Sequence, residues 1–492
     1  MLGIRGKVRY VAAASALSLA ATLVVQPIAS AQVQAPGAGG RPETVIIVLG
    51  GSCTALAEAS SPGATCAQQE PVLAQLQSAG ATVQSTTSLV DTITATVTAG
   101  EAQALESFPA VSQVTPDVTI PVVAPALPTP GRQVSPVPLN APGWRGHGQG
   151  TPTCGTERQP ELDPEALQVI NAQDALDMGI DGGGVTVATI ADGIDTTNPD
   201  LQRNPAYGTT GQPVAQEVDF SGDPAGTPTP GGEMYLDVSS IAAQGNLEYN
   251  LSQYVNPGQA ARLPASGCWI KIVGAAPGAS VLALKVFSTV YDTTESSFIQ
   301  AIQYAVQHGV KVINESFGSN NFPDTVLDIT READDAAVAA GVTIVVSSGD
   351  GGVTNTIGSP ASDPNVISVG ATTTFRSYAQ ANYGGFYNPS VGNGRWADNN
   401  LSDLSSSGFT QAGNTVNLVA PGDLNWALCS TNPTLYTDCS DIDGGTDIGI
   451  QQSGGTSEAA PLTSAAAADV IQAYAKTHGG TDPTPALVSR SS

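Results

Sequence analysis

Short apolar runs alternate with amphipathic stretches along most of the chain. From Leu167 onward, the apolar runs have the length of buried strands and the stretches between them have helical periodicity. The predicted strands are residues 185–190, 281–287, 312–318, 342–347 and 366–371, and the predicted helices are residues 298–308 and 324–340. Because apolar strands that alternate with helices form a mostly parallel sheet covered on both faces, we expect an α/β fold.

A smaller unit precedes this region. Residues 32–122 have the pattern of a separate α+β domain whose elements begin near Thr44. Its predicted strands are residues 44–49, 81–83, 92–97 and 111–120, and its predicted helices are residues 70–78 and 99–108.

The segments on either side of this unit have no such periodicity. Residues 1–31 combine a basic start, an apolar core and an Ala-Ser-Ala end, which is the pattern of a secretory signal peptide. Residues 123–165 are rich in proline and predict a linker or extended arm. No later run is long and apolar enough to span a bilayer. We therefore expect a secreted, extracellular protein without a membrane partner.

Composition narrows the possible partners. The 492 residues include 17 Lys and Arg against 43 Asp and Glu, which gives a formal net charge of −26. Such a charge argues against nucleic acid or an anionic membrane as a partner. It suits a protein that works in acid, where carboxylates are protonated and repel each other less, but solubility after secretion explains it equally well.

Six cysteines suit an oxidising destination. Three plausible pairs are Cys53 with Cys66, Cys154 with Cys268, and Cys429 with Cys439, although six cysteines allow 15 connectivities. Because no Cys-x-x-Cys motif occurs, neither a zinc site nor a redox site is expected.

The most distinctive stretch for chemistry is residues 453–461, Ser-Gly-Gly-Thr-Ser-Glu-Ala-Ala-Pro. Two glycines allow a sharp turn, and an alanine-rich run after them predicts a buried helix with Ser457 at its N-terminus. A serine that merely caps an ordinary helix would look the same. A nucleophilic serine needs a base, and the only histidines are His147 in the proline-rich segment and His308 and His478 at predicted helix ends. None of the three is well placed to act on Ser457.

Several blocks resemble the subtilisin superfamily. Residues 455–461 match its nucleophile motif Gly-Thr-Ser-x-Ala-x-Pro, and residues 274–279 match its Gly-x-Ala-Pro loop before a strand. Residues 313–318 resemble the segment that pairs with extended substrates, which implies substrate contacts at Ser316, Phe317 and Gly318. The resemblance implies a subtilisin-like peptidase domain over residues 166–492, and residues 32–122 resemble the inhibitory propeptide of this superfamily.

Two blocks depart from subtilisins. Ala191 stands where they have the Asp of the triad, with Asp192 one residue later, and no histidine occurs between this strand and Gly274. Instead, Glu233 and Asp237 resemble the sedolisins, or serine-carboxyl peptidases, whose base is a Glu supported by an Asp four residues on. At this spacing on a helix the two carboxyls lie one turn apart and share a proton.

A second sedolisin-like position is Asp350, in the segment Ser-Ser-Gly-Asp. Sedolisins have there an Asp that donates to the oxyanion when it is protonated. A turn Asp that binds its own backbone is the alternative. Asp192 is expected to cap the turn after its strand, and Asp195 and Asp200 are expected to be surface turn residues.

The resemblance implies a serine endopeptidase that is made as a zymogen and is active in acid. Ser457 would be the nucleophile, Glu233 the base, Asp237 its support and Asp350 the oxyanion donor. Its partners would be polypeptide substrates and its own propeptide, and we expect a monomer. No cofactor is expected, and no metal, because the calcium loop of sedolisins has no counterpart. Two other hypotheses stay open: a pseudoprotease that binds peptides or a partner, and an ordinary subtilisin that uses one of the three histidines.

Overall fold

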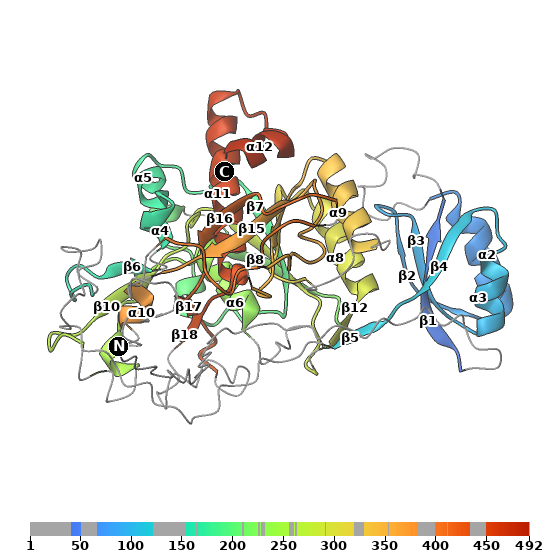
Figure 1. The fold of residues 1–492 in the computed structure, drawn as a ribbon, viewed down its shortest axis with the longest axis horizontal. Helices are drawn as coiled ribbons and strands as arrows, with labels where there is room; N and C mark the ends of the chain where they lie inside the picture. The colour runs from blue at the N-terminus through green and yellow to red at the C-terminus, as the bar shows by residue number, and fades with distance from the viewer. Residues whose placement is uncertain are drawn as a thin grey trace, which may run out of the picture.

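The computed structural model describes residues 41–50, 66–121 and 154–491, with internal gaps of which 319–328, 381–398 and 433–448 are the longest. The expected signal segment 1–31 and most of the expected linker 123–165 lie outside these residues. A small N-terminal unit lies beside a large α/β domain, next to helices α8 and α9 (Figure 1). Among the described residues, no helix combines the length and apolarity that crossing a bilayer requires.

The N-terminal unit is a four-stranded antiparallel sheet in the order β2-β3-β1-β4. Its elements are β1 Glu43–Leu49, α2 Gln69–Ala79, β2 Thr82–Thr87, β3 Thr92–Val97, α3 Ala99–Leu105 and β4 Val111–Pro116. The expected strand 111–120 is interrupted, because β4 ends at Pro116, which has no N–H to donate to a ladder. The chain continues as β5 Thr119–Pro121, which pairs with β12 Asp292–Thr294 of the large domain.

Strand β1 shows how the two parts are joined. Side chains alternate between the faces of a strand, and Val45, Ile47 and Leu49 belong to the core under α2 and α3. Ile46 and Val48 belong instead to the apolar cluster that contains α8 and α9. The N-terminal sheet therefore has one face for its own helices and one for the large domain.

The large domain is built on a seven-stranded sheet in the order β16-β15-β14-β13-β7-β11-β8, and all its neighbouring strands are parallel. The strands are β7 Thr186–Ala191, β8 Val214–Asp219, β11 Ser280–Lys285, β13 Val312–Glu315, β14 Thr343–Ser347, β15 Ile367–Thr372 and β16 Leu418–Pro421. The predicted α/β class with a mostly parallel sheet is confirmed.

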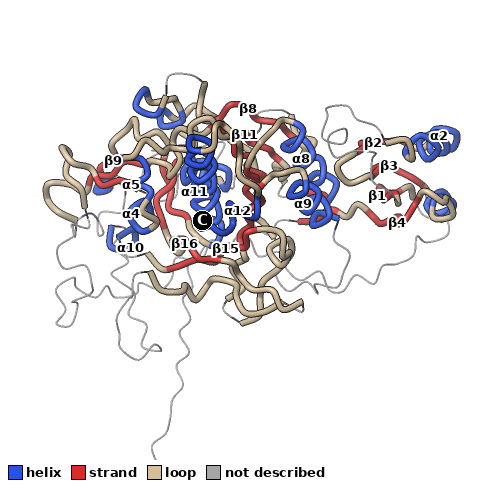
Figure 2. The backbone as a smooth tube through the Cα atoms, turned by 90° about the horizontal axis from the view of Figure 1, so that it is seen from above, coloured by secondary structure: helices blue, strands red, loops and turns tan. Residues whose placement is uncertain are grey.

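Helices cover both faces of this sheet. Helices α8 Glu295–Gln307 and α9 Ile329–Ala339 pack on one face, and α6 Glu233–Ala242 and α11 Thr456–Thr477 pack on the other. Figure 2 shows strands between α11 and the α8–α9 pair. The expected helix 298–308 begins earlier, and the start of the expected helix 324–340 lies outside the described residues.

Smaller elements surround the domain. They are β6 Glu161–Asp163, α4 Ala166–Val169, α5 Ala172–Asp177, β9 Tyr249–Asn250, β10 Trp269–Ile272, α10 Arg376–Gln380, β17 Asn425–Leu428, β18 Ile450–Ser453 and α12 Pro485–Ser491. Strand β6 pairs with β10, and the disulfide Cys154–Cys268 joins the same two segments. Cys66 and Cys429 are also disulfide-bonded, but their expected partners, Cys53 and Cys439, lie outside the described residues.

Candidate active site

The serine turn connects β18 to α11. Gly455 has φ +100°, a conformation that favours glycine. A Cβ at this position would come within 2.5 Å of Asp350 Oδ2, and one at Gly454 would come within 2.5 Å of the Asp423 carbonyl oxygen. Ser457 is the second residue of α11 and is partly exposed. The glycines thus let two acidic segments approach the turn, and Ser457 lies at a helix N-terminus as the sequence predicts.

The structure brings Ser457 and Glu233 together. Glu233 is the first residue of α6 and receives a hydrogen bond from the Ser457 hydroxyl. Ser457 Oγ also lies 3.3 Å from the backbone oxygen of Ser316. A carboxylate at this position has the geometry to accept the proton of the serine.

Asp237 lies one helical turn after Glu233 and is fully buried. Burial raises the pKa of both carboxyls; the neighbouring charge of Asp192 raises the pKa of Glu233 further, and Glu233 does the same for Asp237. Glu233 Oε1 and Asp237 Oδ2 have no hydrogen-bond partner among the described residues. A single proton held between the two carboxyls removes one charge and supplies the missing hydrogen bond.

A chain of polar side chains fixes Asp237 from the sheet side. Ser316 Oγ donates to Asp237 Oδ1 at 2.6 Å, and Asn314 Nδ2 donates to Ser316 Oγ at 3.0 Å. Asn314 in turn accepts from Ser464 of α11 at 2.9 Å. The sequence placed Ser316 in a substrate-binding segment, whereas the structure directs its side chain to Asp237.

Phe317 is also directed inward. Its ring stacks on Phe298 with centroids 4.3 Å apart and meets Phe287 edge-on, and the residue is 8% exposed. The side chain therefore belongs to the core between the sheet and α8. A substrate contact at Phe317 or Gly318 would have to use the backbone.

Asp350 lies beyond the end of β14 and faces the serine turn. Its Oδ1 accepts from the Thr456 N–H at 2.8 Å and from the Thr456 hydroxyl at 2.9 Å. Burial raises the pKa of Asp350 to about 6, although both hydrogen bonds from Thr456 oppose this rise. Because Oδ1 is occupied by two donors, the proton of the neutral acid belongs on Oδ2, the oxygen that faces Gly455.

Asp192 does more than the sequence suggests. Its Oδ2 accepts from the N–H groups of Gly232 and Glu233 at 2.8 and 3.2 Å, and its Oδ1 accepts from Met234 at 2.7 Å. It therefore caps the N-terminus of α6, not the turn of its own strand. The physical reason is the parallel sheet, which places the end of β7 beside the start of α6. Contacts of this range have no short sequence signature.

The expectation for Asp200 is wrong. The residue is fully buried and accepts from the hydroxyl of Tyr249 at 2.7 Å and from the N–H of Leu247 at 2.8 Å. The 3₁₀ turn Pro199–Leu201 carries it inward, where it satisfies the loop after α6. Asp195 is partly buried and accepts from the N–H of Thr197 at 3.1 Å.

The two described histidines lie away from the serine turn, at the ends of α8 and α11. His308 stacks on Tyr304 and His478 stacks on Tyr474, each with ring centroids 3.7 Å apart. His147 lies outside the described residues. Within the part of the chain that the structure describes, no group of three or more His, Cys, Asp or Glu is arranged to hold a metal ion.

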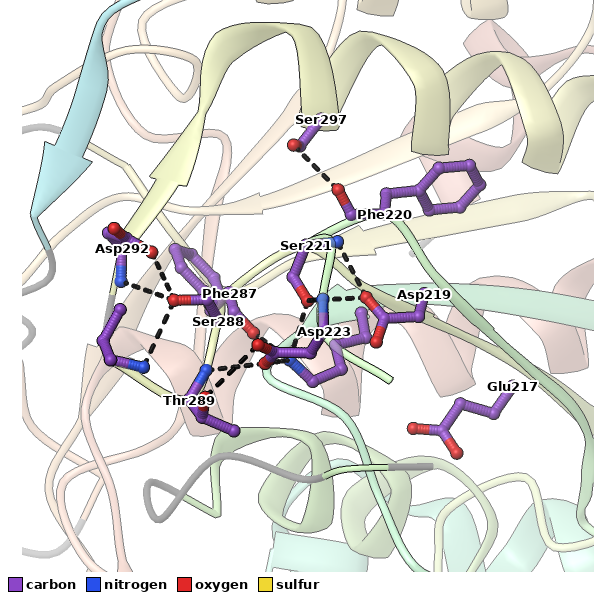
Figure 3. A network of polar contacts seen from close by, with 12 residues as sticks. Glu217, Asp219, Phe220, Ser221, Asp223, Phe287, Ser288, Thr289, Asp292 and Ser297 are labelled. Atoms are coloured by element: carbon purple, nitrogen blue, oxygen red, sulfur yellow. Dashed lines mark hydrogen bonds and ion pairs between the residues drawn. The ribbon is translucent and has the colours of Figure 1, made fainter. Parts of the chain in front are cut away.

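A second polar network lies at the carboxyl ends of β8 and β11 (Figure 3). Lys285 is fully buried, and its Nζ lies 2.9 Å from Asp223 Oδ2 and 3.0 Å from Ser221 Oγ. Asp219 accepts from the N–H and the hydroxyl of Ser221 at 2.7 and 2.6 Å. Burial acts to raise the pKa of Asp223, but hydrogen bonds from Lys285 and Thr289 bring it below its usual value. The network fixes residues 219–223, at the end of β8 and just after it.

Comparisons with known proteins agree with this architecture. The sequence profile described as the Subtilase family matches residues 182–486. The chain is 34% identical over 240 residues to the minor extracellular protease Vpr of Bacillus subtilis (strain 168), which covers 46% of this chain and 26% of Vpr. It is 28% identical over 211 residues to subtilisin E of the same organism, covering 42% of this chain and 46% of subtilisin E.

Among solved structures, the crystal structure of fervidolysin from Fervidobacterium pennivorans, described as a keratinolytic enzyme related to subtilisin, matches with a TM-score of 0.56. The match covers 92% of this chain and 56% of fervidolysin at 20% sequence identity, so it shows the fold alone. The chain spans less than two thirds of each of these relatives. The family profile spans more than half of the chain, and it follows that the chain belongs to the subtilase family.

Proposed function

We propose that this chain is a serine endopeptidase in which a Glu–Asp pair replaces the His–Asp pair of subtilisins, as in the serine-carboxyl peptidases. The observation that carries the proposal is the hydrogen bond from the Ser457 hydroxyl to the carboxyl of Glu233. Asp237 lies one turn away on the same helix, and Asp350 lies against the serine turn from the other side.

In this mechanism Ser457 Oγ attacks the carbonyl carbon of a peptide bond. Glu233 accepts the hydroxyl proton and later transfers it to the leaving amine, and Asp237 holds the shared proton that stabilises the pair. Neutral Asp350 donates from Oδ2 to the tetrahedral oxyanion, together with N–H groups at the start of α11. Water then hydrolyses the acyl-enzyme with Glu233 as base.

The protonation states set the expected pH range. Asp350 must be neutral, so activity falls as the pH rises through its pKa of about 6. One carboxyl of the Glu233–Asp237 pair must be ionised. Burial raises the pKa of Glu233 to about 8, but a proton shared with Asp237 stabilises the singly ionised pair, which therefore loses its first proton at a lower pH, and activity falls toward strong acid. We therefore expect an optimum in weak acid.

The N-terminal unit is proposed to act as an inhibitory propeptide of a secreted zymogen. It contacts the large domain through the β5–β12 pair, and Asp117 accepts from the N–H and hydroxyl of Ser296 at the start of α8, at 3.1 and 2.7 Å. Gln303 of α8 accepts the N–H of Leu89 at 2.9 Å. These contacts support the proposal because they involve backbone groups on both sides.

The test is to express residues 32–492, acidify the protein and follow self-cleavage between residues 122 and 166 together with hydrolysis of a denatured protein. The wild type should cleave, and the variants Ser457→Ala, Glu233→Gln and Asp237→Asn should each lose roughly a hundredfold or more in rate. His308→Ala and His478→Ala serve as controls and should retain activity.

Two results would point elsewhere. If neither the wild type nor any variant cleaves between about pH 3 and 8, a pseudoprotease that binds peptides is the better reading. If His147→Ala abolishes cleavage while Glu233→Gln does not, the protein works as an ordinary subtilisin with an imidazole base.

A further inference from the structure

Glu458 follows the proposed nucleophile directly, but its side chain is buried. The residue is 1% exposed, whereas Ser457 is partly exposed. The next two residues of α11, Ala459 and Ala460, are buried in the apolar core. Burying a carboxyl among apolar side chains is costly unless it is neutral and hydrogen-bonded. Its position therefore needs a physical explanation that the proposed mechanism does not give.

Two side chains hold Glu458. Its Oε1 lies 2.9 Å from Ser240 Oγ of α6 and 3.1 Å from Asn425 Nδ2 of β17, and its Oε2 has no hydrogen-bond partner among the described residues. The orientation of the Asn425 amide is fixed, because its Oδ1 accepts from the Trp426 N–H at 2.9 Å and lies 3.2 Å from Ser377 Oγ.

The hydroxyl of Ser240 indicates which atom carries the proton. Ser240 Oγ lies within hydrogen-bond distance of Glu458 Oε1 and also 3.1 Å from the carbonyl oxygen of Leu236, but it has one proton to donate. If that proton goes to Leu236, the contact with Glu458 is a hydrogen bond only when Glu458 is the donor. With a neutral Glu458, both contacts of Ser240 Oγ are hydrogen bonds: Ser240 donates to the Leu236 carbonyl oxygen and accepts from Glu458.

The electrostatic surroundings support a neutral acid. Burial raises the pKa of Glu458 to about 8; hydrogen bonds from Ser240 and Asn425 oppose this, and the charge of Glu233 adds to it. From α6, Glu233 and Asp237 are the charged groups that interact with it. Among the described residues of α10 and β17, Arg376 is the one cation, and it is paired with Glu161.

These contacts connect the element that carries the proposed base, Glu233, with the element that carries the proposed nucleophile, Ser457. Ser240 lies two turns after Glu233 on α6, and Glu458 is bonded directly to Ser457 on α11. Asn425 belongs to the β17–β18 hairpin, which leads into the serine turn. One side chain thus contacts the helix of the base and the hairpin that delivers the nucleophile.

We propose that Glu458, as a neutral acid hydrogen-bonded to Ser240 and Asn425, is a positioning residue that keeps the Glu233 carboxyl within reach of the Ser457 hydroxyl. This inference rests on the proposed peptidase function. It assigns a role to the first of the two variable positions of the nucleophile motif, which the resemblance leaves without one.

Variants of Glu458 and Ser240 separate the effect of the Glu458 contacts from the effect of a charge on Glu458. Glu458→Ala removes both contacts and should lower kcat about tenfold to a hundredfold with a smaller effect on KM, because a displacement of about 1 Å is enough for such a loss. Glu458→Gln keeps a neutral group with an oxygen at the position of Oε1, which accepts from Asn425 Nδ2 and from the Ser240 hydroxyl when that hydroxyl turns toward it, so it should recover most of the lost kcat. Ser240→Ala should lower kcat in the same direction as Glu458→Ala, and the double variant should lose less than the product of the two.

Asp469 provides a matched control on the same helix. Burial raises its pKa to about 8 as well, but it lies 11 residues further along α11, roughly 16 Å from Glu458. Asp469→Asn should change the pH dependence of the unfolding midpoint without changing the shape of the pH–rate profile. In Glu458→Gln, the loss of kcat near pH 8 that comes from ionisation of residue 458 should disappear.

The result that overturns the positioning role is an active wild type in which Glu458→Ala keeps full kcat, or in which Glu458→Gln is no better than Glu458→Ala. A wild type without Ser457-dependent cleavage overturns the proposed function, and the positioning role is rejected with it. The two failures are therefore distinguished by the wild type and the Ser457→Ala variant alone.

Discussion

At the scale of single residues, the proposed mechanism gives carboxylic acids the tasks that imidazole and amide groups have in subtilisins. An acid can be a base or a hydrogen-bond donor, depending on its proton. The surroundings of Glu233 suit a base, whereas those of Asp350 suit a hydrogen-bond donor. Glu233 receives the serine hydroxyl, whereas Asp350 has one oxygen saturated by Thr456 and the other directed to the turn.

Asp350→Asn should remove one limb of the pH–rate profile. In the wild type the donor is lost as the pH rises through about 6, because Asp350 has a raised pKa and is neutral only below it. An amide donates at every pH, so the ratio of variant to wild-type kcat should increase from about pH 5 to pH 8. Asp350→Ala should instead lose about a hundredfold below pH 6, where the wild type has the donor, and less above it. A constant ratio for Asp350→Asn across this range would show that Asp350 is not the titrating donor.

Asp192→Asn should act on α6 and on Glu233 together. Both carboxylate oxygens of Asp192 accept from backbone N–H groups, but the amide of Asn has only one oxygen that can accept. The variant should therefore lose part of the helix cap, at a cost of about 0.5–2 kcal/mol in the free energy of unfolding. The charge of Asp192 raises the pKa of Glu233, so its removal should move the acid limb of the pH–rate profile to lower pH. Thermal unfolding and kcat against pH measure the two effects. Asp177→Asn, on the exposed α5, is the control and should change neither.

At the scale of elements, the site is assembled where segments distant in sequence end at one edge of the sheet. Strand β7 ends at the cap of α6, β14 leads to Asp350, and β18 leads to the serine turn. Parallel α/β sheets place ligand sites at the carboxyl ends of their strands for this reason. The N-terminal unit contacts a different element, the start of α8, through Asp117.

Asp117→Ala should loosen this contact without unfolding either part. The change removes two acceptor contacts at the N-terminus of α8, which is expected to cost about 1 kcal/mol. Amide hydrogen exchange of residues 119–120 and 295–297 should increase about fivefold relative to the wild type. Glu106→Ala, on the exposed surface of the N-terminal unit, is the control. Equal exchange in the wild type and Asp117→Ala would show that the cap does not hold the unit in place.

At the scale of the whole molecule, the buried carboxyls have mostly raised pKa values. Burial is the main cause for Asp200, Asp350, Glu458 and Asp469 alike. A net charge of −26 adds general repulsion at neutral pH. Both effects make protonation more favourable in the folded state than in the unfolded state.

We therefore expect the Ser457→Ala protein, which cannot digest itself under the proposed mechanism, to be more stable in acid than at neutrality. A group with a raised pKa stabilises the fold fully below its unfolded value, here 3.8 to 4.5, and this contribution is lost as the pH rises through the folded value. For Glu458 and Asp469 the loss extends to about pH 8. Asp223, with its lowered pKa, opposes the trend. Calorimetric unfolding midpoints that increase from about pH 5 to pH 8 would contradict this expectation.

The sequence predicts much of this, for identifiable reasons. Strong apolar periodicity predicts the strands of the large sheet, and glycines with a Thr-Ser pair predict the serine turn. What it misses depends on contacts between distant segments: Asp192 on α6, Asp200 under Tyr249, and Ser316 on Asp237. Each of these is a polar residue whose partner lies 40 or more positions away, so local pattern carries no information about it.

The disulfide between Cys154 and Cys268 encloses the part of the chain that contains Asp192 and the whole of α6. A single break of the backbone anywhere from residue 155 to residue 267 would therefore leave two fragments still linked covalently. Nicked molecules of this kind would migrate as one band on a gel until a thiol reductant is added. Loss of material upstream of Cys154, by contrast, would be visible without reduction.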